Sequence, residues 1–199
     1  MLDDAAADDA GGVSQFEAEY MTDALIDWLD EDSAIASAGG AEDNDYAAKE
    51  FPYLPANHYL GSVNELRIIE HFTVPVITAL KDYVCVIPGT DRHKININTL
   101  DVEKPALLQV LLDIPRADAQ QALAAREEEG FKSADDFFNL PELNNHMLSD
   151  EQKQQFVVDS EYFKLKATAS FNNSYFALNS IMKVEKEQIN VISRTIGRE

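Results

Sequence analysis

Positively charged residues are scarce in this 199-residue sequence. No Lys or Arg occurs between Met1 and Ala48, and the whole chain has 16 of them against 36 Asp and Glu residues. The resulting formal net charge of −20 repels nucleic-acid phosphates and anionic lipid head groups. We therefore expect a soluble chain that binds cations or a basic partner, and no nucleic-acid binding.

Long apolar runs and targeting signals are also missing. No run approaches the roughly 20 apolar residues that a membrane-spanning helix needs. Met1 is followed by Asp3 and Asp4, whereas a signal peptide starts with a basic region and an apolar core. These features predict a soluble polypeptide, and they leave open that it was cut from a longer, anchored protein.

Cysteine occurs once, at Cys85. A lone Cys indicates either a small buried hydrophobe or one half of a disulfide whose partner lies outside this sequence. The histidines show no ligand spacing relative to Cys85 or to one another, so we expect no zinc site at His58, His71, His93 or His146.

Carboxylates, in contrast, are concentrated around one loop within residues 27–46. Like charges at such short range disfavour one another's ionised form. Either solvent and salt screen them in an open loop, or a divalent cation holds them in a folded one. The EF-hand spacing is absent, but a calcium site needs roughly six to eight oxygens, which these side chains and loop carbonyls could supply. The candidate metal ligands are Asp27, Asp30, Asp32, Glu42, Asp43 and Asp45.

Apolar periodicity predicts helices in the first half of the chain. Residues 1–14 contain mainly Asp, Ala and Gly, and we expect a disordered linker there. A helix over 16–29 should bury a face with a four-residue repeat, and Ser62 with Glu65 forms a capping box for another helix. A third helix should start at Thr73. The residues expected on these faces are Phe16, Tyr20, Ala24 and Trp28, then Val76, Ile77, Leu80 and Val84.

Short paired helices are predicted between residues 99 and 141. We expect Thr99 to cap a helix that Pro115 breaks, residues 116–126 to form the next helix, and Gly130 to occupy a helix C′ position. Ser133 should cap a short helix that buries Phe137 and Phe138. The pairing resembles helix-hairpin-helix and SAM-like modules.

DNA binding by such a hairpin is disfavoured. The hairpin at residues 112–117 has no Gly, and Asp113 lies where a phosphate would dock. The −20 net charge acts in the same direction.

The period changes to two near the C-terminus. Residues 162–167, 175–182 and 189–193 read as strands, with turns at Asn172-Asn173 and Glu187-Gln188. A three-stranded antiparallel meander needs a cover over its apolar face. We therefore predict an α+β fold with four segments: a linker at 1–14, a partial first SAM-like module with the acidic loop at 15–60, a second SAM-like module at 61–148, and a β-sheet segment at 149–199.

The order of several short motifs resembles that of the general secretion pathway protein K family, the large minor pseudopilins of type II secretion systems. The resemblance extends over roughly residues 14–194. It is carried by ALIDWLD at 24–30, GAEDNDY at 40–46, PAN at 55–57, VNELR at 63–67, YVCVIP at 83–88, ININT at 95–99, FKSADDF at 131–137 and SEYF at 160–163.

This resemblance implies a pseudopilin body with an inserted helical domain of two SAM-like modules. It implies the C-terminal portion of such a protein, without the prepilin leader, membrane helix and early strands, and hence the periplasmic part of a protein anchored in the inner membrane. The implied role is non-enzymatic. The protein would sit at the pseudopilus tip with minor pseudopilins I and J, nucleate or cap assembly, and serve export of folded proteins, which are further possible partners.

Two site features are implied in the same way. Calcium is associated with the helical domain of the family, and the acidic loop is where we expect Ca²⁺ as cofactor. Family members also carry a Cys upstream, which suggests a disulfide with Cys85.

The residues leave three alternatives open. One is a calcium-binding helical interaction module, and a second is a helix-hairpin-helix nucleic-acid-binding protein. The third is an acid–base hydrolase that uses Asp27 or Glu42, because paired carboxylates permit such chemistry. No nucleophile, base and oxyanion set is readable in the sequence, so we expect no enzyme.

Overall fold

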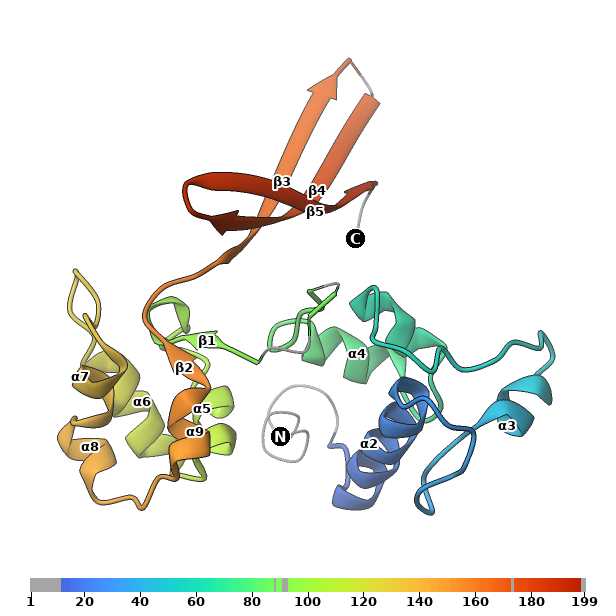
Figure 1. Ribbon diagram of the computed structural model, residues 1–199, viewed down its shortest axis with the longest axis horizontal. Coiled ribbons are helices and arrows are strands. Elements are labelled where there is room, and N and C mark those ends of the chain that lie inside the picture. Colours follow the sequence, from blue (N-terminus) through green and yellow to red (C-terminus); the bar gives the residue numbers. More distant parts are fainter. Residues whose placement is uncertain (1–11, 88, 91–92, 173, 198–199) are drawn as a thin grey trace. The chain divides into compact units, whose positions relative to one another are not determined.

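The chain mixes helices with an antiparallel sheet, which confirms the predicted α+β class (Figure 1). The structure is a computed structural model, and it describes residues 12–87, 89–90, 93–172 and 174–197. Two compact units are present, Met1–Asp91 and Arg92–Glu199. The SAM-like nature of the helical parts stays a prediction.

The first unit is built on helix α2, Gln15–Leu29. Its start is fixed by a capping box, since the Ser14 side chain accepts from the Glu17 amide and the Glu17 carboxylate accepts from the Ser14 amide. The helix was correctly predicted, but its buried stripe consists of Met21, Ala24, Asp27 and Trp28. Phe16 is 60% exposed, so the predicted apolar face extends one turn too far toward the N-terminus.

The described part of this unit also contains α3 (Asp43–Ala47), the 3₁₀ helix η1 (Val63–Arg67) and α4 (Val74–Leu80). Ser62 and Glu65 form the predicted capping box, although the helix they start is 3₁₀. Helix α4 follows Thr73 as predicted and buries Val76 and Ile77. It ends at Leu80, so the expectation that Val84 belongs to its buried face is wrong.

The core of the first unit contains residues from both sides of the module boundary that we predicted at residue 60. Trp28 meets Tyr46 edge-on with ring centroids 5.2 Å apart, and Leu66, Ile69 and Ile77 pack into the same cluster. Residues 61–90 therefore belong with the first unit, and the predicted module boundary at 60/61 is displaced to 91/92.

The predicted linker also ends earlier than expected. Val13 is buried in a small cluster with Met21 and Val76, and Ser14 caps α2. Residues 1–11 of the linker lie outside the described residues.

The helical part of the second unit surrounds its own core. Its elements are β1 (Ile95–Asn96), η2 (Ile97–Thr99), α5 (Ala106–Leu112), α6 (Arg116–Ala124), α7 (Ala134–Phe138), α8 (Pro141–Asn144), α9 (Asp150–Gln154) and β2 (Phe156–Val157). Strands β1 and β2 pair in parallel. Helices α5 and α6 meet at Asp113, which adopts a left-handed φ of 53°. The core contains Ile97, Leu108, Leu123, Phe137 and Phe156 among others.

Two predicted helix ends in this unit are wrong. Thr99 donates its hydroxyl to the Asn96 carbonyl within η2, and α5 begins only at Ala106, after Pro105. Gly130 lies beyond the end of α6 in a separate turn, where its φ is +75°. There it faces Asn98, whose side chain accepts from the Phe131 amide and donates to two carbonyls. The glycine is therefore required by a tertiary contact and not by a helix end.

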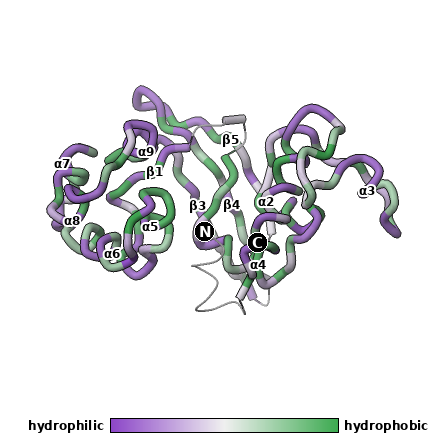
Figure 2. The backbone as a smooth tube through the Cα atoms, turned by 90° about the horizontal axis from the view of Figure 1, so that it is seen from below, coloured by the Kyte–Doolittle hydropathy of each residue, from purple (hydrophilic) through white to green (hydrophobic). Residues whose placement is uncertain are grey.

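The C-terminal sheet confirms the predicted meander. Strands β3 (Tyr162–Phe171), β4 (Ser174–Glu185) and β5 (Gln188–Ile196) pair antiparallel in the order β3-β4-β5. The register places Leu165 opposite Ser180 and Ser180 opposite Arg194. Hydrophobic and hydrophilic residues alternate along the strands (Figure 2), so the sheet has one apolar face and one polar face. Asn173 of the predicted first turn lies outside the described residues, and the second turn is formed by Lys186 and Glu187.

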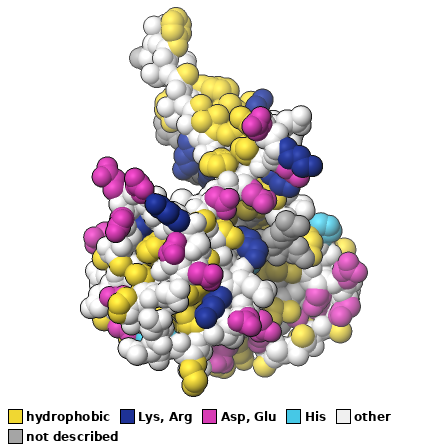
Figure 3. All heavy atoms as spheres, turned by 60° about the vertical axis from the view of Figure 1, so that its left-hand side comes forward, with side chains coloured by type: hydrophobic (Ala, Val, Ile, Leu, Met, Phe, Trp, Pro, Cys, Tyr) yellow, Lys and Arg dark blue, Asp and Glu magenta, His cyan; other side chains and the backbone are white. Residues whose placement is uncertain are grey.

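The apolar face of the sheet is exposed in this chain. Hydrophobic side chains gather on the sheet in the space-filling view (Figure 3). The exposed ones on this face include Phe163, Leu165, Phe176, Ile189, Val191 and Ile196. Such a continuous apolar surface marks a site that another element or protein covers.

Cys85 is exposed, so its interpretation as a buried hydrophobe is wrong. Its disulfide with a Cys outside this sequence stays a prediction. Among the described residues, no helix combines the length and the apolar character that a bilayer crossing requires.

Candidate functional site: an acidic loop between two helices

Three carboxylates converge where the chain leaves α2 and returns to start α3. Asp30, Asp32 and Glu42 each offer one carboxylate oxygen, and these oxygens all lie within 4.8 Å of one another. Asp30 is the C-cap residue of α2, and Glu42 is the N-cap residue of α3. The helix ends thus carry two of the three groups, and the loop between them carries the third.

Several carboxylates of this loop are buried without a hydrogen-bond partner in the described part of the chain. Glu42 is 3% exposed and both of its carboxylate oxygens lack a partner; Asp27 Oδ2 and Asp30 Oδ1 lack one too. Burying a charged group without a partner is costly. The folded loop therefore requires a positive charge or protonation at this point.

The pKa values of Glu42 and Asp27 show the same cost of burying a charge. Burial raises the pKa of Glu42 above its ordinary value, and the charges of Asp27 and Asp30 raise it further. Burial also raises the pKa of Asp27, partly offset by a hydrogen bond from the Ala36 amide. Both shifts show that the fold without a cation disfavours the ionised carboxylates.

Asp27 shapes the loop from inside. It is fully buried, its Oδ1 accepts from the Ala36 amide at 3.4 Å, and its Oδ2 lies against Gly40. A Cβ atom at position 40 would overlap Asp27 Oδ2, so only glycine permits this approach of the backbone.

The remaining predicted ligands have structural roles. Asp45 Oδ2 accepts from the Glu42 amide at 3.0 Å, which satisfies a backbone donor at the start of α3. Asp43 Oδ2 is 3.5 Å from the Ser33 hydroxyl. Of the six candidates, the structure brings together Asp30, Asp32 and Glu42, places Asp27 beside them, and leaves Asp43 and Asp45 outside the converging group.

Asn57 contacts this loop from a segment distant in sequence. Its Nδ2 donates to the Asp32 carbonyl at 3.1 Å, while its Oδ1 is buried without a partner among the described residues. Its φ of 44° is left-handed, a conformation that Asn tolerates better than most residues.

The donor set fits a hard divalent cation. All of the converging atoms are oxygens, and carboxylate oxygens are the ligands that Ca²⁺ prefers. In the part of the chain that the structure describes, no group of His or Cys converges in a comparable way, so the set does not suit zinc. The buried, unpartnered oxygens are the independent observation that distinguishes this cluster from an ordinary solvated acidic loop.

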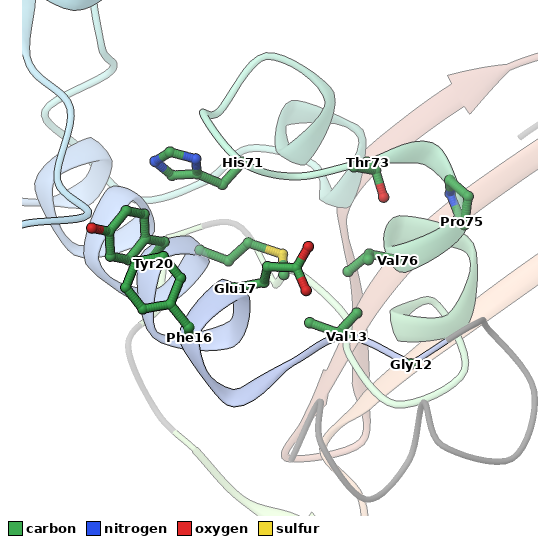
Figure 4. A pocket seen from close by; sticks show the side chains of 10 residues that line it. Gly12, Val13, Phe16, Glu17, Tyr20, His71, Thr73, Pro75 and Val76 are labelled. Atoms are coloured by element: carbon green, nitrogen blue, oxygen red, sulfur yellow. The ribbon is translucent and has the colours of Figure 1, made fainter.

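A second concave feature lies between α2 and the segment that leads into α4. It is a pocket of about 530 Å³, with Phe16 and Tyr20 on the α2 side and Val76 on the α4 side (Figure 4). Two of its polar side chains have partners outside the pocket: Glu17 caps α2, and His71 Nε2 lies 3.1 Å from the Gly39 carbonyl. Its apolar walls are formed by Val13, Phe16, Met21, Pro75 and Val76.

Comparison with known proteins agrees with this architecture. Two family models, both described as type II secretion system protein K, match residues 9–89 and 95–159. The "Type II secretion system protein K" of Aeromonas hydrophila is 34% identical over 93% of this chain and 56% of its own length. The protein of the same name from Dickeya chrysanthemi is 34% identical over 91% of this chain and 49% of its own length. The chain thus spans about half the length of the curated relatives it matches.

A solved structure is similar over nearly the whole chain. It is titled the crystal structure of the GspK-GspI-GspJ complex from the enterotoxigenic Escherichia coli type 2 secretion system. The matching chain superposes with a TM-score of 0.82 at 30% identity, covering 94% of this chain and 66% of that one. The junction between the two family models, at residues 90–94, coincides with the junction between the two compact units. The chain therefore belongs to the type II secretion system protein K family.

Proposed function

We propose that this chain is part of a minor pseudopilin that assembles with pseudopilins I and J at the tip of a type II secretion pseudopilus, where it nucleates or caps the filament. The observation that carries the proposal is the likeness to the solved GspK-GspI-GspJ complex over 94% of this chain. On this proposal the role is structural, and no reaction is assigned to the chain.

The exposed apolar face of the β3-β4-β5 sheet supports an assembly role. A three-stranded sheet is marginal without a cover over its apolar face, so this surface favours contact with another part of the filament. On this proposal the chain is the periplasmic part of a protein that is anchored in the inner membrane. The assembled pseudopilus serves the export of folded proteins, which are further partners.

We also propose that Ca²⁺ is the structural cofactor, held by Asp30, Asp32 and Glu42 with Asp27 beside them. The ion would supply the positive charge that the buried carboxylates lack, and so stabilise the loop between α2 and α3. No acid–base or redox step is assigned to it.

Reconstitution tests the assembly proposal. The chain would be mixed with purified I and J subunits of the system it comes from, and complex formation would be followed by size-exclusion chromatography with light scattering. We expect a complex that contains all three proteins. Failure to bind either subunit, in calcium and at physiological salt, would contradict the proposal, as would a shift of duplex DNA by this chain at low salt.

A further inference from the structure

We propose that Arg194 is the polar anchor of the apolar sheet face, and that it pairs with a carboxylate of the partner pseudopilin that covers this face. The inference rests on the assembly proposed above and adds the chemistry of the partner to it. That partner would present an apolar surface with one Asp or Glu opposite Arg194, and the ion pair would fix how it lies across the strands.

Arg194 lies in the middle of an otherwise apolar surface. Residues paired across antiparallel strands lie on the same face, so Leu165, Ser180 and Arg194 form one row across β3, β4 and β5. The neighbouring rows are apolar throughout, with Phe163, Met182 and Val191 on one side and Ala167, Leu178 and Ile196 on the other. Within these three rows, the guanidinium is the one charged group.

The Arg194 side chain is held over the sheet and does not extend past its edge. Strand β5 is an edge strand of the described sheet, so a long side chain on it could reach sideways into water. Instead, Arg194 Nε donates to Ser180 Oγ on the central strand at 3.3 Å, and Ser180 is only 1% exposed. A partner on this face would therefore cover the guanidinium.

Such a cover would leave Arg194 without a counter-charge from its own chain. The bond to Ser180 uses one of the five N–H donors of the guanidinium, and no carboxylate pairs with Arg194 among the residues that the structure describes. Taking a charged group out of water is costly unless that group is paired. A carboxylate suits the remaining donors, because it can accept two parallel hydrogen bonds from a guanidinium.

The charge of the sheet also favours an acidic partner surface. Residues 162–197 contain five Lys and Arg against two Glu, whereas the whole chain has 16 Lys and Arg against 36 Asp and Glu. The sheet is thus a positively charged segment of a strongly acidic chain. Its charge attracts carboxylates during encounter, and Arg194 marks the point on the apolar face where one of them would bind.

A second copy of this chain does not meet this requirement. In a symmetric dimer the same patch of both copies meets itself. The three rows around Arg194 contain no Asp or Glu, so two copies would bring two cations and no counter-charge to the interface. A different polypeptide, the partner pseudopilin, fits the face better.

Surface plasmon resonance of Arg194 variants against immobilised I and J subunits tests the proposal. Arg194→Gln removes the charge but keeps hydrogen-bond donors, Arg194→Lys keeps the charge without the planar fork, and Arg194→Glu reverses the charge. We expect Arg194→Gln to weaken binding by about tenfold or more, mainly through faster dissociation, because the partner's carboxylate is left buried and unpaired. Arg194→Lys should retain part of the affinity, and Arg194→Glu should bind more weakly than Arg194→Gln.

Lys186→Gln is the matched control, because it removes one positive charge from the exposed turn between β4 and β5 and leaves the apolar face unchanged. It should change the affinity less than about threefold, through the association rate, and high salt should abolish the difference. Urea unfolding of all variants should match that of the parent chain, since Arg194 and Lys186 are both exposed.

A charge swap separates ion pairing from a merely structural role of Arg194. Replacing the Asp and Glu residues of the subunits one at a time should identify one carboxylate whose loss and Arg194→Gln together cost no more than either change alone. Arg in place of that carboxylate should restore binding to Arg194→Glu.

The outcomes distinguish this inference from the assembly proposal. If the parent chain binds neither subunit, the proposed assembly fails and the role of Arg194 fails with it. If the parent chain binds a subunit and Arg194→Gln binds it equally well, the assembly stands and the role of Arg194 is wrong. The face would then be covered by another segment or by a second copy.

Discussion

At the scale of residues, the molecule is governed by a few groups that are placed where their charge or shape is costly. Glu42 and Asp27 are carboxylates in the interior, Asn57 holds an unpaired amide oxygen, and Gly40 lies against Asp27 where no Cβ atom fits. Each is unfavourable in isolation; the charge of Asp27 also raises the pKa of Glu42, and Asp27 lies against Gly40. When several residues at one place violate the local rules that the rest of the chain follows, that place is a candidate functional site.

Calcium should raise the melting temperature of the chain, and the size of this increase should depend on Glu42. A ligand at about 100 times its dissociation constant that binds only the folded state adds about 2.7 kcal/mol. We expect Glu42→Gln to raise the melting temperature in chelator, because it removes a buried charge, and to reduce the increase that calcium produces. Asp43→Asn, outside the converging group, should leave the calcium increase largely intact. Melting curves that are identical in calcium and in chelator for the parent chain would refute the metal role.

Gly40→Ala should destabilise the first unit by about 1–3 kcal/mol, the usual cost of forcing an extra group into a packed site. The added methyl would overlap Asp27 Oδ2, and the loop would have to move away from the carboxylate. Gly12→Ala is the control, since nothing lies within 4 Å of a Cβ atom there. Urea unfolding of both variants measures the difference; equal stabilities would mean that the loop accommodates the methyl group freely.

At the scale of elements, local sequence signals predicted most helices and strands correctly. The helix start and the unit boundary that they mispredicted depend on contacts between residues distant in sequence. Ser62 and Ser133 cap the elements they were expected to cap, and Pro115 separates α5 from α6. These features depend on a few adjacent residues. Thr99 failed as a cap because the Asn96 turn uses its hydroxyl, and the boundary at residue 60 failed because Leu66 and Ile77 pack on Trp28.

At the candidate site, too, the sequence indicated the region, and the fold determined which residues converge. The run of acids was evident in the sequence, but which of them converge depends on how the loop folds between α2 and α3. Asp45 was among the candidate ligands, and its side chain instead accepts from the Glu42 amide at the start of α3. The contact between Asn57 and the Asp32 carbonyl joins residues 25 positions apart, which no local pattern indicates. The composition of the sequence indicated where the site lies, but only the fold shows which carboxylates converge.

The turn at Gly130 gives a test of one such distant contact. Gly130→Ala should lose stability through a left-handed alanine, about 1–2 kcal/mol, and through contact with Asn98 Oδ1 at 2.8 Å from the new Cβ. Gly89→Ala has a similar φ, +78°, but open space around the Cβ position, so it should show the backbone cost alone. Chemical denaturation that finds the two variants equally destabilised would mean that Asn98 yields without cost.

The sheet gives a second test at this scale. Replacing Leu165 and Phe176 with Ser removes two exposed apolar side chains from one face, and we expect at least tenfold weaker binding to the I and J subunits with little loss of stability. Asn190→Ser is the control because Asn190 pairs with Lys183 on the opposite, polar face. Surface plasmon resonance against immobilised I and J compares the variants, and unchanged binding would exclude this face from the interface.

At the scale of the whole chain, the organisation is two units with separate cores. Clusters around Trp28 and Tyr46 lie within the first unit, and the cluster around Leu108 and Phe137 lies within the second. The candidate cation site lies in the first unit alone. The −20 charge of the chain adds a general electrostatic preference for cations, which added salt screens, whereas a built site should still select Ca²⁺.

Differential scanning calorimetry should therefore resolve two transitions, of which calcium moves only one. A ligand stabilises the cooperative unit that forms its site, and a unit with its own core and no ligand is left where it was. We expect the same transition to be lowered by Gly40→Ala, and the other to be lowered by Gly130→Ala. Magnesium at equal concentration controls for screening by divalent charge. A single transition that calcium shifts as a whole would mean that the two cores unfold as one, and that the ion's effect extends through the entire chain.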